Sequence, residues 1–118
     1  MTVNQMQFEF TIMQARLVLF AKECGFNLSL REVWREGRRQ LELFNAGLSK
    51  TMNSQHLKSL AADFVMFRDG DPVEAGDDPD WLTLGEYWEH LGGTWGGRWD
   101  MSSAPGQQPD AGHFEYGE

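Results

Sequence analysis

The spacing of apolar residues changes several times along this chain of 118 residues, and each change restricts the fold that the chain can adopt. The first pattern has the spacing of a helix with one apolar face, formed by Phe10, Met13, Leu17, Phe20 or Ala21, and Cys24. Thr11 and Gln14 are placed as in a capping box, and Gly25 follows as a stop signal. We therefore predict a helix over residues 11–24.

Shorter segments with strand-like patterns follow. Apolar and polar residues alternate, or β-branched and aromatic residues gather, over residues 27–34, 61–67 and 113–116. The polar stretch 49–54 and the acidic stretch 69–80 are predicted to be loops.

Two more helices are predicted between these strands. One covers residues 36–47, with Leu41 and Phe44 facing inward, and the other opens with a capping box of Thr83 and Glu86. The resulting order predicts a small α+β domain with a central antiparallel sheet flanked by helices. The hydrophobic fraction of 41% is enough for one core, so we expect residues 1–118 to form a single domain and a monomer.

The formal net charge of −8 is unevenly distributed. Residues 1–68 contain nine Lys or Arg and six Asp or Glu, whereas residues 69–118 contain one Arg and twelve acidic residues. An acidic chain without a basic run lacks the cation clusters that bind phosphate backbones, so nucleic-acid binding is not expected. The mildly basic first part is compatible with an anionic polymer, although a solvated surface is the simpler explanation.

Cys24 is the single cysteine, which excludes an internal disulfide and a four-cysteine zinc site. Its place in the helical pattern predicts a buried thiol, so a Cys/His nucleophile pair is not expected. The N-terminus lacks the features of a signal peptide, and no segment approaches the roughly 20 apolar residues that cross a membrane. We therefore expect synthesis and folding in the cytoplasm, without membrane insertion.

The chain has three histidines, and two of them lie within seven residues of an aspartate. Asp63 follows His56 by seven residues, and Asp110 precedes His113 by three. A catalytic zinc ion takes N and O ligands from such side chains and keeps one position open for water. His90 ends a predicted helix and is interpreted as a solvated residue. Spacing alone leaves solvated or structural histidines as the alternative to a metal site.

Three motifs, taken together, resemble one known family. Ser54–Asp63 reads SQHLKSLAAD and resembles the pattern S-x-H-x-x-G-x-A-x-D, while Asp110–Glu115 reads DAGHFE and resembles the family's second motif. Trp95–Trp99 reads WGGRW and resembles a stretch that is common in the phage and prophage members of the same family. The upstream segments Glu32–Arg35 and Gly47–Thr51 resemble the lead-in to the first motif. The chain thus resembles the zinc D-Ala-D-Ala carboxypeptidase and L-Ala-D-Glu endopeptidase family, which is VanY-like and has the Hedgehog/DD-peptidase fold.

The resemblance implies roles for individual residues. His56, Asp63 and His113 would be zinc ligands, and Asp110 would be the general base for the attacking water and later the proton donor to the leaving amine. Arg35 would stabilise the oxyanion, with an ordinary salt-bridge arginine as the alternative. One position departs from the pattern, because Ser59 replaces the motif glycine and would be strained if that position needs a positive φ.

Other residues have a weaker assignment. Ser54 is interpreted as orienting the site or capping a loop, and Trp95 and Trp99 as walls of a substrate groove or as core. Glu115 is a candidate partner that orients His113.

The resemblance implies a small zinc peptidase that hydrolyses the L-Ala–D-Glu bond of the peptidoglycan stem peptide, as phage endolysins do. Such a protein would be made in the cytoplasm and reach the cell wall in the periplasm through a holin. One alternative is a D-Ala-D-Ala carboxypeptidase, in which Arg38, Arg39 or Lys50 would bind the terminal carboxylate. A second alternative is a non-catalytic zinc-containing module that binds the cell wall. A lysozyme-type mechanism is not expected, because nothing in the sequence marks a pair of carboxylates.

Overall fold

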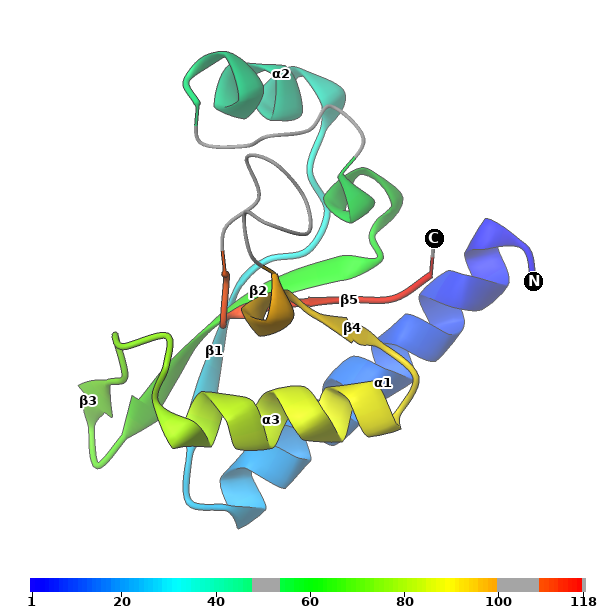
Figure 1. Ribbon diagram of the computed structural model, residues 1–118. Coiled ribbons are helices and arrows are strands. Elements are labelled where there is room, and N and C mark those ends of the chain that lie inside the picture. Colours follow the sequence, from blue (N-terminus) through cyan, green and yellow to red (C-terminus); the bar gives the residue numbers. More distant parts are fainter. Residues whose placement is uncertain (48–53, 100–108, 118) are drawn as a thin grey trace.

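The computed structural model describes residues 1–47, 54–99 and 109–117 (Figure 1). Its helices are α1 (Val3–Glu23), α2 (Gly37–Asn45) and α3 (Pro79–His90), with short 3-10 helices η1 (Gln55–Lys58) and η2 (Gly96–Arg98). Its strands are β1 (Asn27–Glu32), β2 (Ala61–Arg68), β3 (Asp71–Pro72), β4 (Thr94–Trp95) and β5 (His113–Glu115). The predicted α+β class and antiparallel sheet are confirmed. Within the described residues, no helix is both long and apolar enough to cross a membrane.

The sheet has the order β1-β2-β5-β4, with β3 paired to the far end of β2, and every pairing is antiparallel. β5 therefore lies between β2 and β4, although it follows both in the sequence. In β2, Ala62, Phe64 and Met66 are buried, whereas the side chains between them are less covered. This alternation gives the sheet one face toward the core and one face toward the functional residues.

The core lies between the sheet and two helices. α1 contributes Phe10, Met13, Leu17 and Ala21, and α3 contributes Trp81, Leu84 and Trp88. Figure 1 shows α1 and α3 on one side of the sheet and α2 on the other side. Phe114 of β5 is fully buried and makes edge contacts with Phe64 and Trp88, so the last strand is also part of the core.

Both predicted capping boxes are wrong. α1 begins eight residues before the predicted start, and its capping box consists of Thr2 and Gln5. Thr11 lies inside the helix, where its hydroxyl donates to the Gln7 carbonyl oxygen at 2.8 Å. α3 is likewise capped by Asp78, which leaves Thr83 inside it. Thr can bond the carbonyl one turn earlier, so the same residue spacing occurs within helices as well as at their ends.

Three burial predictions are also wrong. Leu41 and Phe44 of α2 are 45% and 43% exposed, and the buried residue of this helix is Gln40. Cys24 is exposed because α1 ends at Glu23 and Cys24 occupies the C-cap position. The acidic stretch 69–80 is not simply a loop, since it contains β3 and the first two residues of α3. The predicted loop 49–54 falls almost wholly outside the described residues.

Candidate metal centre

His56 lies in η1, the 3-10 helix that leads into β2. Ser54 caps this helix, because its Oγ accepts a hydrogen bond from the His56 backbone N–H at 3.1 Å. The helix ends at Ser59, whose φ of 55° and ψ of 40° lie in the left-handed region. The position of the motif glycine therefore has a positive φ, and the serine there is strained. His56 itself is only 2% exposed.

β2 and β5 carry the other two predicted metal ligands, Asp63 and His113. Asp63 and His113 are direct cross-strand partners in this antiparallel pair. Their side chains project from the sheet face opposite to the one that buries Ala62 and Phe114. A register shift in β1 also places Glu32 beside Asp63. The sheet register thus brings residues 50 positions apart into contact.

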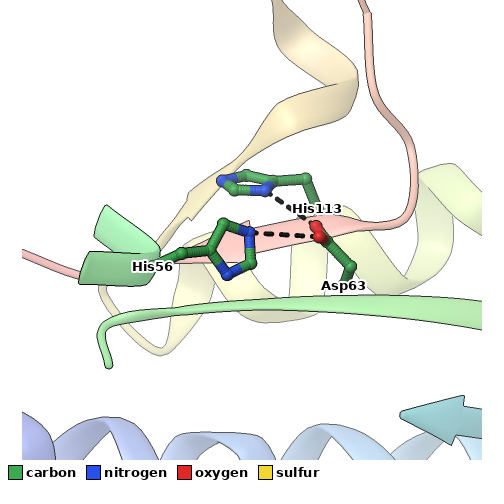
Figure 2. Close-up of side chains that lie close together, drawn as sticks. All are labelled: His56, Asp63 and His113. Carbon is green, nitrogen blue, oxygen red and sulfur yellow. Dashed lines mark hydrogen bonds and ion pairs between the residues drawn. The ribbon is translucent and has the colours of Figure 1, made fainter. Parts of the chain in front are cut away.

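The two histidine rings point at the same carboxylate, as Figure 2 shows. His56 Nε2 lies 3.1 Å from Asp63 Oδ2, and His113 Nδ1 lies 3.0 Å from Asp63 Oδ1. One potential ligand atom from each of the three residues lies within 4.8 Å of the others. The Asp63 side chain is 30% exposed, so the cluster is reachable from solvent.

The remaining nitrogen of each ring has a hydrogen-bond acceptor outside the cluster. His56 Nδ1 is 2.8 Å from the Val33 carbonyl oxygen, and His113 Nε2 is 2.8 Å from Glu115 Oε1. In a neutral ring these outer nitrogens carry the proton, so the inner nitrogens present lone pairs to the Asp63 carboxylate. The two inner nitrogens and the carboxylate would repel one another if all three presented lone pairs to the same point. A cation or a shared proton between them removes this repulsion. The donor set therefore fits a zinc ion.

The charges of the cluster shift the pKa values of its members. Burial alone would raise the pKa of Asp63, but the hydrogen bonds and positive charges of His113 and His56 hold it well below its usual range. Burial alone would lower the pKa of His113, but Asp63 and Glu115 outweigh burial and raise it to about 9. Without a metal, the proton on His113 therefore offsets the negative charge of the Asp63 and Glu115 carboxylates.

Arg35 lies beside the cluster. Its Nη2 is 3.8 Å from Asp63 Oδ2, and its side chain is 10% exposed. The backbone N–H of Arg35 donates to the His56 carbonyl oxygen at 3.0 Å, two residues after Val33 accepts from the His56 ring. The segment that follows β1 is thus joined to His56 by two hydrogen bonds. Sequence patterns gave no sign of this backbone contact.

Asp110 occupies the turn before β5. Its backbone N–H donates to the Gly96 carbonyl oxygen at 2.9 Å, and its carbonyl oxygen accepts from His113 at 3.2 Å. Burial of the carboxyl group raises its pKa above the usual value, His113 opposes this shift, and the charge of Asp63 adds to it. Asp110 therefore lies within electrostatic reach of the cluster.

The two tryptophans of the WGGRW segment have different surroundings. Trp95 is 4% exposed, belongs to the core, and donates through Nε1 to the Ala111 carbonyl oxygen at 2.8 Å. A Cβ added at Gly85 or Gly97 would lie 2.1 or 2.2 Å from its indole ring, so both glycines are needed for space. Trp99 is half-buried and packs against His113, with 4.8 Å between ring centroids.

The remaining candidate residues lie outside the cluster. Arg38 and Arg39 are exposed on α2, and Lys50 lies outside the described residues. His90 is exposed as the last residue of α3. Although Cys24 is exposed, it is not among the hydrogen-bond partners of His56 and His113, whose ring nitrogens contact Val33, Asp63 and Glu115.

Comparisons with solved structures show the same fold. The Serratia marcescens L-Ala D-Glu endopeptidase ChiX is 24% identical with a TM-score of 0.63, over 87% of this chain and 77% of that one. The LdcB LD-carboxypeptidase is 17% identical with a TM-score of 0.69, over 92% of this chain and 57% of that one. The D,D-pentapeptidase VanY of a VanB-type resistance cassette, solved as a mutant in complex with Zn(II), is 16% identical with a TM-score of 0.64. The match covers 91% of this chain and 70% of that one.

A comparison with curated protein sequences finds no match. A family model described as D-alanyl-D-alanine carboxypeptidase matches residues 47–116. This match includes η1, the whole of β2 and β5, and the cluster of His56, Asp63 and His113, while Arg35 lies before it. Because the match covers more than half of the 118 residues, the chain belongs to the D-alanyl-D-alanine carboxypeptidase family of zinc peptidoglycan peptidases.

Proposed function

We propose that this protein is a zinc-dependent peptidase that hydrolyses the L-Ala–D-Glu bond of the peptidoglycan stem peptide. The observation that carries the proposal is the convergence of His56 Nε2, Asp63 and His113 Nδ1, each histidine being oriented by a second acceptor. Zinc held by these three residues would lower the pKa of a water molecule and polarise the peptide carbonyl.

The neighbouring residues have separate tasks in this proposal. Asp110 accepts a proton from the attacking water and returns it to the leaving amine, and its raised pKa suits both steps. Arg35, fixed beside Asp63, offers positive charge where the carbonyl oxygen becomes negative. Trp99, packed on His113, forms one wall of the site. Ser54 supports the site indirectly by capping η1.

The choice of bond rests on the resemblance of the WGGRW segment to phage and prophage members and on the fold shared with the ChiX endopeptidase. Lysis of the cell wall after release from the cytoplasm is part of the same proposal. A D-Ala-D-Ala carboxypeptidase is the second candidate, favoured by the description of the matching family. That activity needs a cation for the free terminal carboxylate, and Arg38 or Arg39 of α2 would supply it.

Mass spectrometry of fragments released from purified peptidoglycan, with and without a chelator, tests the proposal. The expected result is chelator-sensitive release of stem peptides that begin at D-Glu, with L-Ala left on the muramic acid. Release of single D-Ala would instead establish the carboxypeptidase. No release from either sample, with zinc present in the protein, would refute both activities and favour a binding module.

A further inference from the structure

Gln40 is a buried polar residue on a helix whose other residues are exposed or half-exposed. It is 0% exposed, whereas the apolar Leu41 and Phe44 of the same helix face solvent. Burying an amide is unfavourable unless it is hydrogen-bonded, so packing alone would favour an apolar residue at this position. The burial of Gln40 therefore calls for an explanation by its contacts.

Gln40 contacts the guanidinium of Arg35. Its Oε1 accepts a hydrogen bond from Arg35 Nη1 at 2.7 Å. On the other side of the guanidinium, Glu32 Oε1 accepts from Arg35 Nε at 2.8 Å and also from Nη2. The planar group is thus held at both ends, and its Nη2 is left 3.8 Å from Asp63 Oδ2. Two acceptors in different directions fix both the place and the rotation of the plane.

We propose that Gln40 is a positioning residue, which holds the Arg35 guanidinium in the orientation that serves catalysis. This inference rests on the proposed function, because Arg35 acts there on the developing negative charge. A glutamine suits this task because it is a neutral acceptor. Glu32 and Asp63 already place two negative charges beside Arg35, and a third carboxylate would weaken the field that the guanidinium exerts on the substrate.

A double-mutant cycle tests the proposal. Gln40→Met keeps the approximate side-chain volume and removes the acceptor, and it is measured alone and in an Arg35→Ala background. The substrate is the muropeptide that the unmodified protein cleaves. We expect kcat to fall about 10- to 100-fold with Gln40→Met alone, as misplacement of a catalytic group does, while KM changes much less. In the Arg35→Ala background the same change should alter kcat less than about 2-fold.

Gln7→Met is the matched control. Gln7 of α1 also loses a hydrogen bond on this substitution, from its Nε2 to the Lys58 carbonyl oxygen at 2.7 Å. The described side-chain partners of the Arg35 guanidinium are Glu32, Gln40 and Asp63, so this control leaves them in place. It should leave kcat within about 2-fold. If Gln40→Met lowers kcat by the same factor in both backgrounds, or does not lower it at all, the positioning role is refuted.

A measurement without substrate separates this inference from the proposed function. Proton exchange at Arg35 Nη1, the nitrogen that donates to Gln40, should become faster in Gln40→Met and remain unchanged in Gln7→Met, as followed by ¹⁵N NMR on the metal-free protein. Unchanged exchange in Gln40→Met overturns the inference even if the protein is an active peptidase. Should Gln40→Met fail to fold, Gln40→Glu replaces it, with a lowered kcat expected only when Arg35 is present; equal loss in both backgrounds refutes the role.

Discussion

Replacing Ser59 by glycine should stabilise this protein, although most substitutions destabilise proteins. Ser59 ends η1 with φ 55° and ψ 40°, and its backbone N–H donates to the His56 carbonyl oxygen at 3.2 Å. The next residue, Leu60, closes the turn by donating to the Gln55 carbonyl oxygen at 3.0 Å. These bonds require the left-handed conformation whichever residue occupies the position.

The size of the effect follows from two opposing contributions. A left-handed conformation costs an L-residue about 1–2 kcal/mol, which glycine avoids. Glycine loses more conformational entropy on folding, which costs about 0.5–1 kcal/mol. The difference between the two contributions spans about 0–1.5 kcal/mol, so the free energy of unfolding should rise by about 0.75 kcal/mol. For a domain of this size, this corresponds to a rise in Tm of about 2–4 °C.

Thermal and urea unfolding of Ser59→Gly, followed by circular dichroism on the metal-free protein, measures this effect. Ser29→Gly is the matched control, because Ser29 lies in β1 opposite Val65, where the same substitution should lower Tm by a similar amount. A lowered Tm in Ser59→Gly, equal to that of Ser29→Gly, would show that the backbone at this turn is not the source of strain.

Three further predictions concern the metal centre. His113→Ala should abolish stoichiometric zinc and peptidase activity, measured by metal analysis and muropeptide release; a variant with full zinc and activity would remove His113 from the ligand set. Asp110→Ala should keep zinc but lower kcat about 10²-fold or more, and near-normal turnover would show that Asp110 is not the base. Because the pKa of His113 is raised to about 9 and zinc takes the neutral ring, zinc binding at pH 7.5 should release about one proton and weaken as pH falls. Calorimetry in buffers of different ionisation enthalpy measures this release. If zinc binding releases no proton, the assignment of His113 as the protonated group is contradicted.

Periodicity predicted the order and type of the main helices and strands, most clearly for α1, β2 and α3, because each of these three buries one regular face. The ends of α1 and α3 could not be predicted, since Thr11 and Thr83 have the spacing of capping residues but bond carbonyls inside their helices. β4, with two residues, is too short to show a pattern. The burial of α2 was predicted wrongly, because its inward residue is the polar Gln40.

The residues of the candidate site were predicted from motifs, and their meeting follows from the sheet register. Asp63 and His113 face each other because β5 pairs with β2. Spacing alone could not give this pairing, because 50 residues separate the two side chains. The Val33 carbonyl oxygen that orients His56 could not be predicted either, since any residue provides a backbone carbonyl.

The position of β5 inside the sheet has a consequence for synthesis. His113 leaves the ribosome 50 residues after Asp63, which at about 5–20 residues per second is a delay of about 3–10 s. During this interval His56 and Asp63 lack their third partner, and β2 and β4 lack the strand that joins them. The nascent chain therefore holds an incomplete candidate metal site and an open sheet edge until its final described strand is made. β5 carries both His113 and the buried Phe114. The pairing of this one strand therefore completes the hydrophobic core and the candidate metal centre together.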